Sequence, residues 1–303
     1  MTPLLSVQEI GNIFLKLENR NPSGLHKNRI YRNIPEYYAL NPVQFYSLGS
    51  CGNSALCAMH YLENLPVELH IFIPESFLAF YKQRFVEKAG GQVLLHKVNG
   101  TYEAAIKMSR DFCSEKGGGE DISTASSFFK KYRCSYRKII DEVALQLNED
   151  YDSITWFIPI GDGGTFFELK SGANENRWKR QRFFGVSVPH YNSIYESLRM
   201  GLGEHKPLDP AIIKVDEYNI PLLNWNAAYG RECFQQLKKF SAIIGPEREQ
   251  VLKARKRLES TFKGKFGVVS SVVFAGLNQY LHRSSESVGN KNSSTAYVAI
   301  LTD

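Results

Sequence analysis

The chain has 303 residues, with 37 Lys and Arg against 31 Asp and Glu, a formal net charge of +6. A surplus this small excludes a polybasic nucleic-acid tail and predicts an ordinary solvated surface, with some preference for anionic ligands in a cleft. Hydrophobic residues make up 43% of the sequence and aromatic residues 13%, so the chain can bury a core and is not mainly disordered.

Short apolar strands alternate with amphipathic helices along most of the chain. This alternation requires right-handed crossovers and predicts an α/β fold with mostly parallel, buried sheets. We expect strands over residues 13–17, 45–48, 67–73, 92–95, 153–160 and 183–188, and helices over residues 27–40, 55–62, 77–89, 102–115, from 166 onward, 247–261 and 267–281.

Two compositional features bear on location and metal binding. No uncharged apolar run reaches the roughly 18 residues of a membrane span, and the N-terminus lacks the pattern of a secretory signal. The five cysteines are odd in number and show no C-x-x-C spacing, which argues against a disulfide scaffold or a zinc site. We therefore expect a cytoplasmic protein with no membrane partner and no metal.

A glycine loop lies between the strand at 153–160 and the helix that follows. Ligands of α/β sheets bind outside the carboxyl ends of strands, where backbone amides face outward. Glycines permit positive φ and close approach, so the loop is suited to hold a phosphate, although a simple tight turn explains it equally well. It matches neither the P-loop nor the dinucleotide fingerprint. Its residues are Gly161, Asp162, Gly163, Gly164 and Thr165.

Lys27 follows a turn at residues 21–24 and stands at the start of a predicted helix. A cation at the positive end of a helix is unfavourable unless it points into solvent or has a partner. Burial there would lower the pKa of the lysine and make its neutral amine available for imine chemistry. In isolation, an ordinary surface lysine is the simpler interpretation.

Together these motifs resemble those of the fold-type II pyridoxal-phosphate enzymes, the family of the tryptophan synthase beta subunit, cysteine synthase and threonine synthase. The motifs occur in the family's order over about residues 2–170. Residues 2–4 resemble its T-P-L opening, residues 13–18 its K-L-E strand, residues 21–29 its N-P-T-G-S-F-K-D-R motif, residues 49–54 its S-S/T-G-N-T loop, residues 71–75 a strand end, residues 135–147 its segment with the pattern G-x-K-T-I-A-x-E-I-x-x-Q-L, and residues 161–165 its G-T-G-G-T loop.

The resemblance implies an architecture and a cofactor. It implies two three-layer α/β/α domains with mostly parallel sheets, and pyridoxal 5′-phosphate in the cleft between them. Residues 1–40 and 138–303 would form a large cofactor-binding domain, and residues 41–137 a small mobile domain carrying the substrate carboxylate loop. A homodimer is expected from the resemblance only.

The resemblance also assigns roles residue by residue. Lys27 matches the lysine that forms an imine with the cofactor and later moves the substrate Cα proton. The glycine loop matches the cofactor phosphate site, and Asn53 matches the asparagine at the pyridine 3′ oxygen. The substrate carboxylate would be bound by Ser50, Cys51, Gly52, Asn53 and Ser54.

In this family the pyridine nitrogen meets Ser or Thr rather than Asp. That leaves the nitrogen largely unprotonated and favours elimination at the β-carbon over transamination or racemisation. Ser270 resembles the cysteine synthase serine and Thr302 the threonine synthase threonine; we favour Ser270. Family members commonly continue past the position of Asp303 through a glycine-rich segment that covers the cofactor, which makes Thr302 the less secure candidate.

Some residues depart from the family pattern without deleting a catalytic group. Leu25 and His26 replace the usual residues before the lysine, Asn28 replaces Asp, and Ser54 replaces Thr. His26 is either a second acid or base beside the cofactor or, more simply, a structural residue, because adjacent helix residues point in different directions.

The implied activity is that of an amino-acid synthase or lyase. Such an enzyme eliminates the β-substituent of an O-activated serine-type substrate to an aminoacrylate and can then add a nucleophile. The alternatives are threonine-synthase-like chemistry on O-phosphohomoserine, dehydration of serine or threonine, and a catalytically inactive binding protein. Retention of Lys27, Asn53 and the glycine loop argues against the last alternative.

A nucleic-acid site is a further alternative, which rests only on a local basic and aromatic cluster. We expect no nucleic-acid partner. The cluster comprises Phe128, Phe129, Lys130, Lys131, Tyr132, Arg133, Tyr136 and Arg137.

Overall fold

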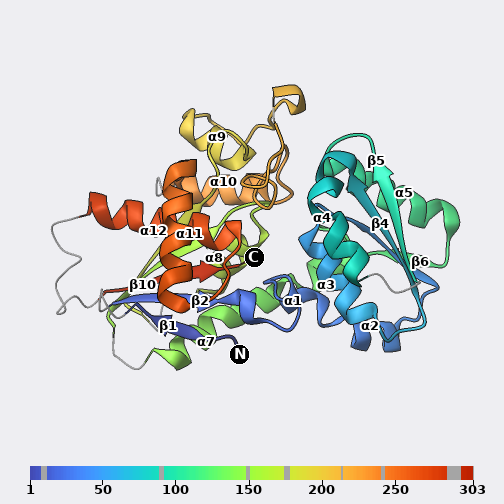
Figure 1. Cartoon of the computed structure of the whole chain (residues 1–303), viewed down its shortest axis with the longest axis horizontal. Helices are drawn as coiled ribbons and strands as arrows, with labels where there is room; N and C mark the ends of the chain where they lie inside the picture. Colours follow the sequence, from blue (N-terminus) through green and yellow to red (C-terminus); the bar gives the residue numbers. More distant parts are fainter. Residues whose placement is uncertain are drawn as a thin grey trace. The chain divides into compact units, whose positions relative to one another are not determined.

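The computed structural model describes residues 1–7, 12–88, 92–147, 151–173, 178–212, 214–239, 243–284 and 295–302. The chain forms two compact units, each built around its own sheet (Figure 1). The first unit comprises residues 1–24, 136–208 and 222–303, and the second comprises residues 25–135 and 209–221. Both sheets are mostly parallel and alternate with helices, which confirms the predicted α/β class.

The sheet of the first unit has six strands, of which only β1 runs antiparallel to its neighbour. Its two central strands, β10 and β7, are apolar and buried over nearly their whole length, as expected for parallel strands covered on both faces. The strand order is β1 (Leu4–Ser6), β2 (Ile13–Leu17), β10 (Thr295–Leu301), β7 (Ser153–Pro159), β8 (Arg180–Val186) and β9 (Ile243–Ile244).

Helices cover both faces of this sheet. Val186 of β8 packs against Gly276 of α12, whereas a side chain at Gly185 would meet Leu237 of α10. Because consecutive strand residues face opposite sides, α10 and α12 lie on opposite faces. The helices of this unit are η1 (Glu18–Arg20), α7 (Lys138–Gln146), α8 (Gly164–Gly172), α9 (Ser193–Arg199), α10 (Gly230–Lys238), α11 (Arg248–Phe262) and α12 (Val268–Arg283).

The second unit has a four-stranded, all-parallel sheet in the order β5 (Val93–Val98), β4 (Glu68–Pro74), β3 (Phe45–Gly49) and β6 (Gly119–Asp121). Helix α5 contacts β3 and β4, and α4 contacts β4 and β5. The helices are α1 (Asn28–Tyr31), α2 (Ile34–Leu40), α3 (Asn53–Leu62), α4 (Glu75–Lys88), α5 (Tyr102–Lys116), α6 (Ser127–Tyr132) and η3 (Pro210–Ile212), with η2 (Arg133–Arg137) at the junction with the first unit.

The helix expected over residues 27–40 is divided into α1 and α2. Pro35 lies in the first turn of α2, where its missing N–H costs no hydrogen bond, but it cannot continue a helix that began earlier. The side-chain amide of Asn33 donates to the carbonyl oxygens of Arg29 and Ile30 and so caps α1. Among the described residues, no helix is long and apolar enough to span a membrane.

Candidate active site

Lys27 is the last residue before α1, in the second unit. The chain reaches it through a tight turn, in which the Gly24 amide donates to the Asn21 carbonyl oxygen at 2.7 Å and Gly24 has a φ of 77°. The Lys27 carbonyl oxygen accepts from Ile30 and Tyr31, and its Nζ lies 5.7 Å from the centroid of the Phe129 ring. The half-buried ammonium thus has an aromatic contact, and α1, with four residues, is too short for the dipole argument to decide its role.

The loop at residues 50–54 connects β3 to α3. The Ser50 hydroxyl oxygen accepts from the amides of Gly52 at 2.9 Å and Ala55 at 3.2 Å, which fixes the loop against the start of α3. Gly52 has a φ of 132°, a conformation that favours glycine. Asn53 and Ser54 open the helix, where amides lack acceptors within the helix and can bind an anion.

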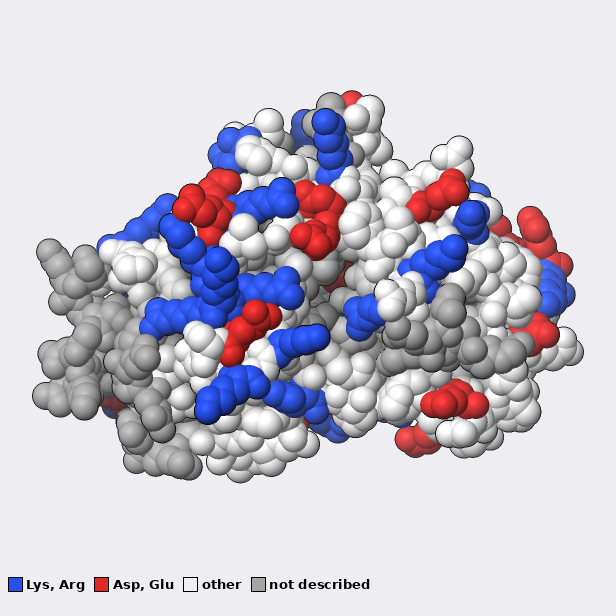
Figure 2. All heavy atoms as spheres, in the orientation of Figure 1, with Lys and Arg blue, Asp and Glu red and all other residues white. Residues whose placement is uncertain are grey.

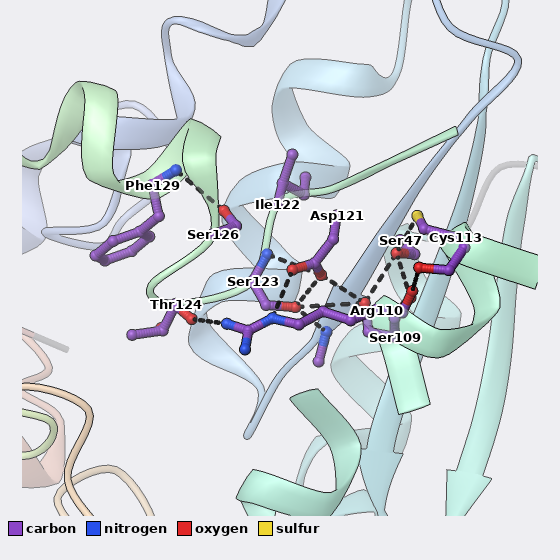
Figure 3. A network of polar contacts seen from close by, with 12 residues as sticks. Ser47, Ser109, Arg110, Cys113, Asp121, Ile122, Ser123, Thr124, Ser126 and Phe129 are labelled. Atoms are coloured by element: carbon purple, nitrogen blue, oxygen red, sulfur yellow. Dashed lines mark hydrogen bonds and ion pairs between the residues drawn. The ribbon is translucent and has the colours of Figure 1, made fainter. Parts of the chain in front are cut away.

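A buried polar network supports the residue before this loop (Figure 3). The Gly49 amide donates to the Ser123 hydroxyl oxygen at 2.7 Å, and the Ser123 hydroxyl in turn donates to the Asp121 carboxylate. Ser109 of α5 also donates to Asp121, at 2.7 Å, and shares a hydrogen bond with Ser47 of β3. The network therefore joins β3, α5 and β6 at the point where the loop begins.

The glycine loop at residues 161–165 connects β7 to α8 in the first unit. Gly163 is left-handed, with a φ of 86°, and a Cβ there would lie 2.6 Å from Cys233 Sγ, so only glycine fits. Asp162 Oδ1 accepts from the Gly164 amide at 2.8 Å, and the Gly163 carbonyl oxygen accepts from Phe167. Gly164 and Thr165 begin α8, so their amides are placed at a helix N-terminus.

Three residues that the sequence did not single out hold the backbone of the glycine loop. Asn192, which is fully buried, donates to the carbonyl oxygens of Ile160 and Gly161. Cys233 Sγ donates to the Gly163 carbonyl oxygen at 3.0 Å, and the Tyr229 amide donates to the Asp162 carbonyl oxygen at 3.0 Å. Asn192 also caps α9, and that pattern is the only signal in the sequence that marks it.

Ser270 and Thr302 are neighbours in the same unit. The Ser270 hydroxyl, in the first turn of α12, donates to the Thr302 carbonyl oxygen at 3.0 Å. Thr302 is fully buried, and within the described part of the chain its Oγ1 has no hydrogen-bond partner. Because β10 runs parallel to β7 with Ala299 opposite Phe157, Thr302 lies at the same sheet edge as the glycine loop.

The family of the chain follows from a comparison with protein-family models. The model described as "Pyridoxal-phosphate dependent enzyme" matches residues 1–303. The chain belongs to this family. It is therefore a pyridoxal-phosphate-dependent enzyme, and the predicted family, enzyme class and cofactor are confirmed. A search of curated protein sequences gives no match.

Solved structures of pyridoxal-phosphate enzymes share the fold. An L-serine ammonia-lyase from Rhizomucor miehei is 17% identical, with a TM-score of 0.75, 99% of this chain and 92% of that chain being covered. A threonine deaminase isoform 2 from Solanum lycopersicum is 18% identical, with a TM-score of 0.74 and coverage of 99% and 78%. A serine racemase from Dictyostelium discoideum is 17% identical, with a TM-score of 0.71 and coverage of 99% and 92%. At these identities the similarity shows the fold alone.

The basic and aromatic cluster does not form a platform for nucleic-acid bases. Phe128, Phe129 and Tyr136 are buried in the protein, so their rings are not available for stacking. Arg137 pairs with the buried carboxylate of Glu168 at 2.8 Å, and Lys131 lies over the rings of Tyr37 and Tyr132. Across the described ranges, no group of His, Cys, Asp and Glu side chains is arranged to hold a metal ion.

Proposed function

We propose that this pyridoxal-phosphate enzyme catalyses β-elimination from a serine-type amino acid, with β-replacement where a nucleophile follows. The observation that carries the proposal is the buried hydroxyl of Thr302, which has no hydrogen-bond partner among the residues that the structure describes. A neutral hydroxyl opposite the pyridine nitrogen leaves that nitrogen largely unprotonated, whereas a carboxylate would protonate it. A weaker electron sink favours elimination over transamination.

Thr302 is the better candidate for this contact than Ser270, which the sequence favoured. The Ser270 hydroxyl already donates to the Thr302 carbonyl oxygen, whereas Thr302 Oγ1 makes no hydrogen bond within the described ranges and so retains its donor and acceptor capacity there. A buried hydroxyl without a partner is costly, and a ring nitrogen acceptor would satisfy it. The fit of the buried Thr302 hydroxyl and the glycine cradle at Gly163 to the cofactor supports the proposal.

The other residues of the proposed site would bind different parts of the cofactor and substrate. The amides of the glycine loop would hold the cofactor phosphate, and Asn53 would donate to its 3′ oxygen. The amides of residues 50–54 would bind the substrate carboxylate. When bound, pyridoxal phosphate withdraws electrons from the substrate Cα. Lys27 would take the proton from Cα, and its ammonium would then be placed to protonate the leaving group.

The substrate is proposed as an O-activated serine or serine itself. The similarity in fold to an L-serine ammonia-lyase and a threonine deaminase supports the inclusion of unactivated serine and threonine. Threonine-synthase-like chemistry on O-phosphohomoserine is the second candidate, which the Asn-Pro-Ser-Gly turn before Lys27 favours. A homodimer and the large and small domains predicted above remain part of the proposal, and light scattering of the purified protein tests the dimer.

The experiment combines absorbance with product analysis. We expect pyridoxal phosphate to give the purified protein a visible absorbance band, which Lys27→Ala abolishes and Lys130→Ala, at an exposed lysine of α6, retains. L-serine, L-threonine, O-acetyl-L-serine, O-phospho-L-serine and O-phosphohomoserine are then tested for release of a keto acid and ammonia. Loss of the visible band through conversion of the cofactor to its amine form, without ammonia, would overturn the elimination proposal in favour of transamination.

A further inference from the structure

Tyr81 of α4 reaches the loop at residues 50–54. The residue is 5% exposed, and its ring stacks on Phe85 with the centroids 5.9 Å apart. The guanidinium of Arg84 lies 5.9 Å from the Tyr81 ring centroid. The Tyr81 hydroxyl donates to Asn53 Oδ1 at 3.3 Å. Helix α4 therefore places the buried hydroxyl of Tyr81 against Asn53, the first residue of α3.

The ring of Tyr81 also shapes the loop backbone. A Cβ at Gly52 would overlap the ring atoms Cζ, Cε1 and Cε2 of Tyr81. Together with the φ of 132°, this contact leaves glycine as the residue that fits at position 52. The Tyr81 ring thus packs directly against Gly52, the residue before Asn53.

The hydrogen bond sets the orientation of the Asn53 amide. Burial raises the pKa of Tyr81 well above its ordinary value, so the phenol stays protonated and remains a donor. The side-chain amide oxygen of Asn53, Oδ1, is then the acceptor, and the amide nitrogen Nδ2 of Asn53 is directed away from Tyr81. An amide presents either an oxygen or an NH₂ group in a given direction, so this contact decides which end is available elsewhere.

We propose that Tyr81 is a positioning residue that orients the Asn53 amide so that Nδ2 donates to the 3′ oxygen of the cofactor. The proposal rests on the function proposed above. Without the Tyr81 hydroxyl the amide can rotate and place its oxygen against the 3′ oxygen, an acceptor against an acceptor. The Nδ2 donor stabilises the deprotonated 3′ oxygen, and the visible absorbance band of the bound cofactor belongs to that form.

The test is Tyr81→Phe in the cofactor-loaded protein, which removes the hydroxyl and keeps the ring. We expect the ratio of the visible to the near-ultraviolet band to fall by about fivefold, the effect of losing one hydrogen bond. Circular dichroism checks that the variant is folded.

Two further variants make the result specific. Tyr102→Phe removes the hydroxyl of a tyrosine that is also 5% exposed; this hydroxyl donates to Thr124 Oγ1 at 2.9 Å in the same unit, and its loss should leave the spectrum unchanged. Asn53→Asp keeps an oxygen for Tyr81 but removes the Nδ2 donor, so it should lower the band ratio at least as far. Adding Tyr81→Phe to Asn53→Asp should then have no further effect.

The outcomes separate this inference from the proposed function. A wild-type protein without a visible band overturns the proposed function and the role of Tyr81 with it. A wild-type visible band whose ratio to the near-ultraviolet band is unchanged by Tyr81→Phe overturns the role of Tyr81 alone. An effect of Tyr81→Phe that persists in full in the Asn53→Asp background shows that Tyr81 does not act through Asn53, and also overturns it.

Discussion

At the scale of single residues, Asp162 is the least expected member of the glycine loop. The family motif has Thr at this position, whereas here a carboxylate oxygen accepts from the Gly164 amide at 2.8 Å. The carboxylate brings a negative charge into a loop proposed to hold a phosphate dianion. It also accepts a hydrogen bond from the Gly164 amide, one of the amides that a phosphate would use. Both effects weaken phosphate binding.

Asp162→Asn is expected to tighten pyridoxal phosphate binding by about three- to tenfold, because it removes the charge but keeps an oxygen for the Gly164 amide. Titration of the visible band at several salt concentrations measures the effect, which should shrink as salt screens the repulsion. Weaker binding by the variant would show that the carboxylate supports the loop instead of opposing the phosphate.

At the scale of elements, strands β4 and β5 share a histidine pair. His70 Nδ1 lies 2.9 Å from His96 Nε2, and His70 Nε2 lies 3.2 Å from Glu68 Oε2. Burial lowers the pKa of both histidines, assisted for His96 by His70 and for both by Lys116, while Glu68 partly raises that of His70. The surrounding rings, Phe45, Phe72 and Phe112, add no charge that would offset this.

This pair predicts a pH dependence of stability. Because the histidine pKa is depressed in the folded protein, the unfolded chain binds protons more readily than the folded protein does. The free energy of unfolding is therefore highest above pH 6.5, the ordinary histidine pKa, and it falls as the pH drops from 6.5 toward the lower pKa of the folded protein. His96→Gln should reduce the fall in thermal midpoint between about pH 7.5 and 5.5, whereas His60→Gln on α3 should not. An unchanged pH profile in His96→Gln would contradict the assignment.

Local sequence patterns do not predict every helix and strand of the fold. Most helices and strands of the first two thirds of the chain could be predicted, because each follows from local periodicity and a glycine turn. Strand β10 was not predicted, although its run Thr-Ala-Tyr-Val-Ala-Ile-Leu is apolar and rich in strand formers. Its place between β2 and β7 depends on pairing with residues far away in the sequence, which no local pattern records.

At the scale of the whole molecule, part of the positive charge is concentrated on one helix. Figure 2 shows Lys and Arg side chains gathered over α11, a helix with two acidic residues. The basic residues of that helix are Arg248, Lys253, Arg255, Lys256 and Arg257. Two of them, Lys253 and Arg255, pair with acidic residues one turn away. The helix contributes 5 − 2 = +3, half of the surplus of +6.

The cofactor should also stabilise the folded chain as a whole. A ligand that binds only the folded state at about 100 times its Kd adds about 2.7 kcal/mol to the free energy of unfolding. Pyridoxal phosphate should therefore raise the thermal midpoint by several degrees, and pyridoxal, which lacks the phosphate that residues 161–165 are proposed to hold, should raise it less. Equal shifts with the two compounds would argue against the phosphate role of the glycine loop.

The sequence by itself determined the family, the α/β class and the two loops, because each motif is contiguous and its glycines are required by local backbone geometry. Only the tertiary structure supplied the observation on which our proposal of Thr302 over Ser270 rests, namely the hydrogen bond that joins the end of β10 to the start of α12. It likewise revealed Cys233 beneath Gly163 and Tyr81 beneath Gly52. These contacts join residues far apart in the chain, so they depend on strand order and helix packing rather than on any local pattern.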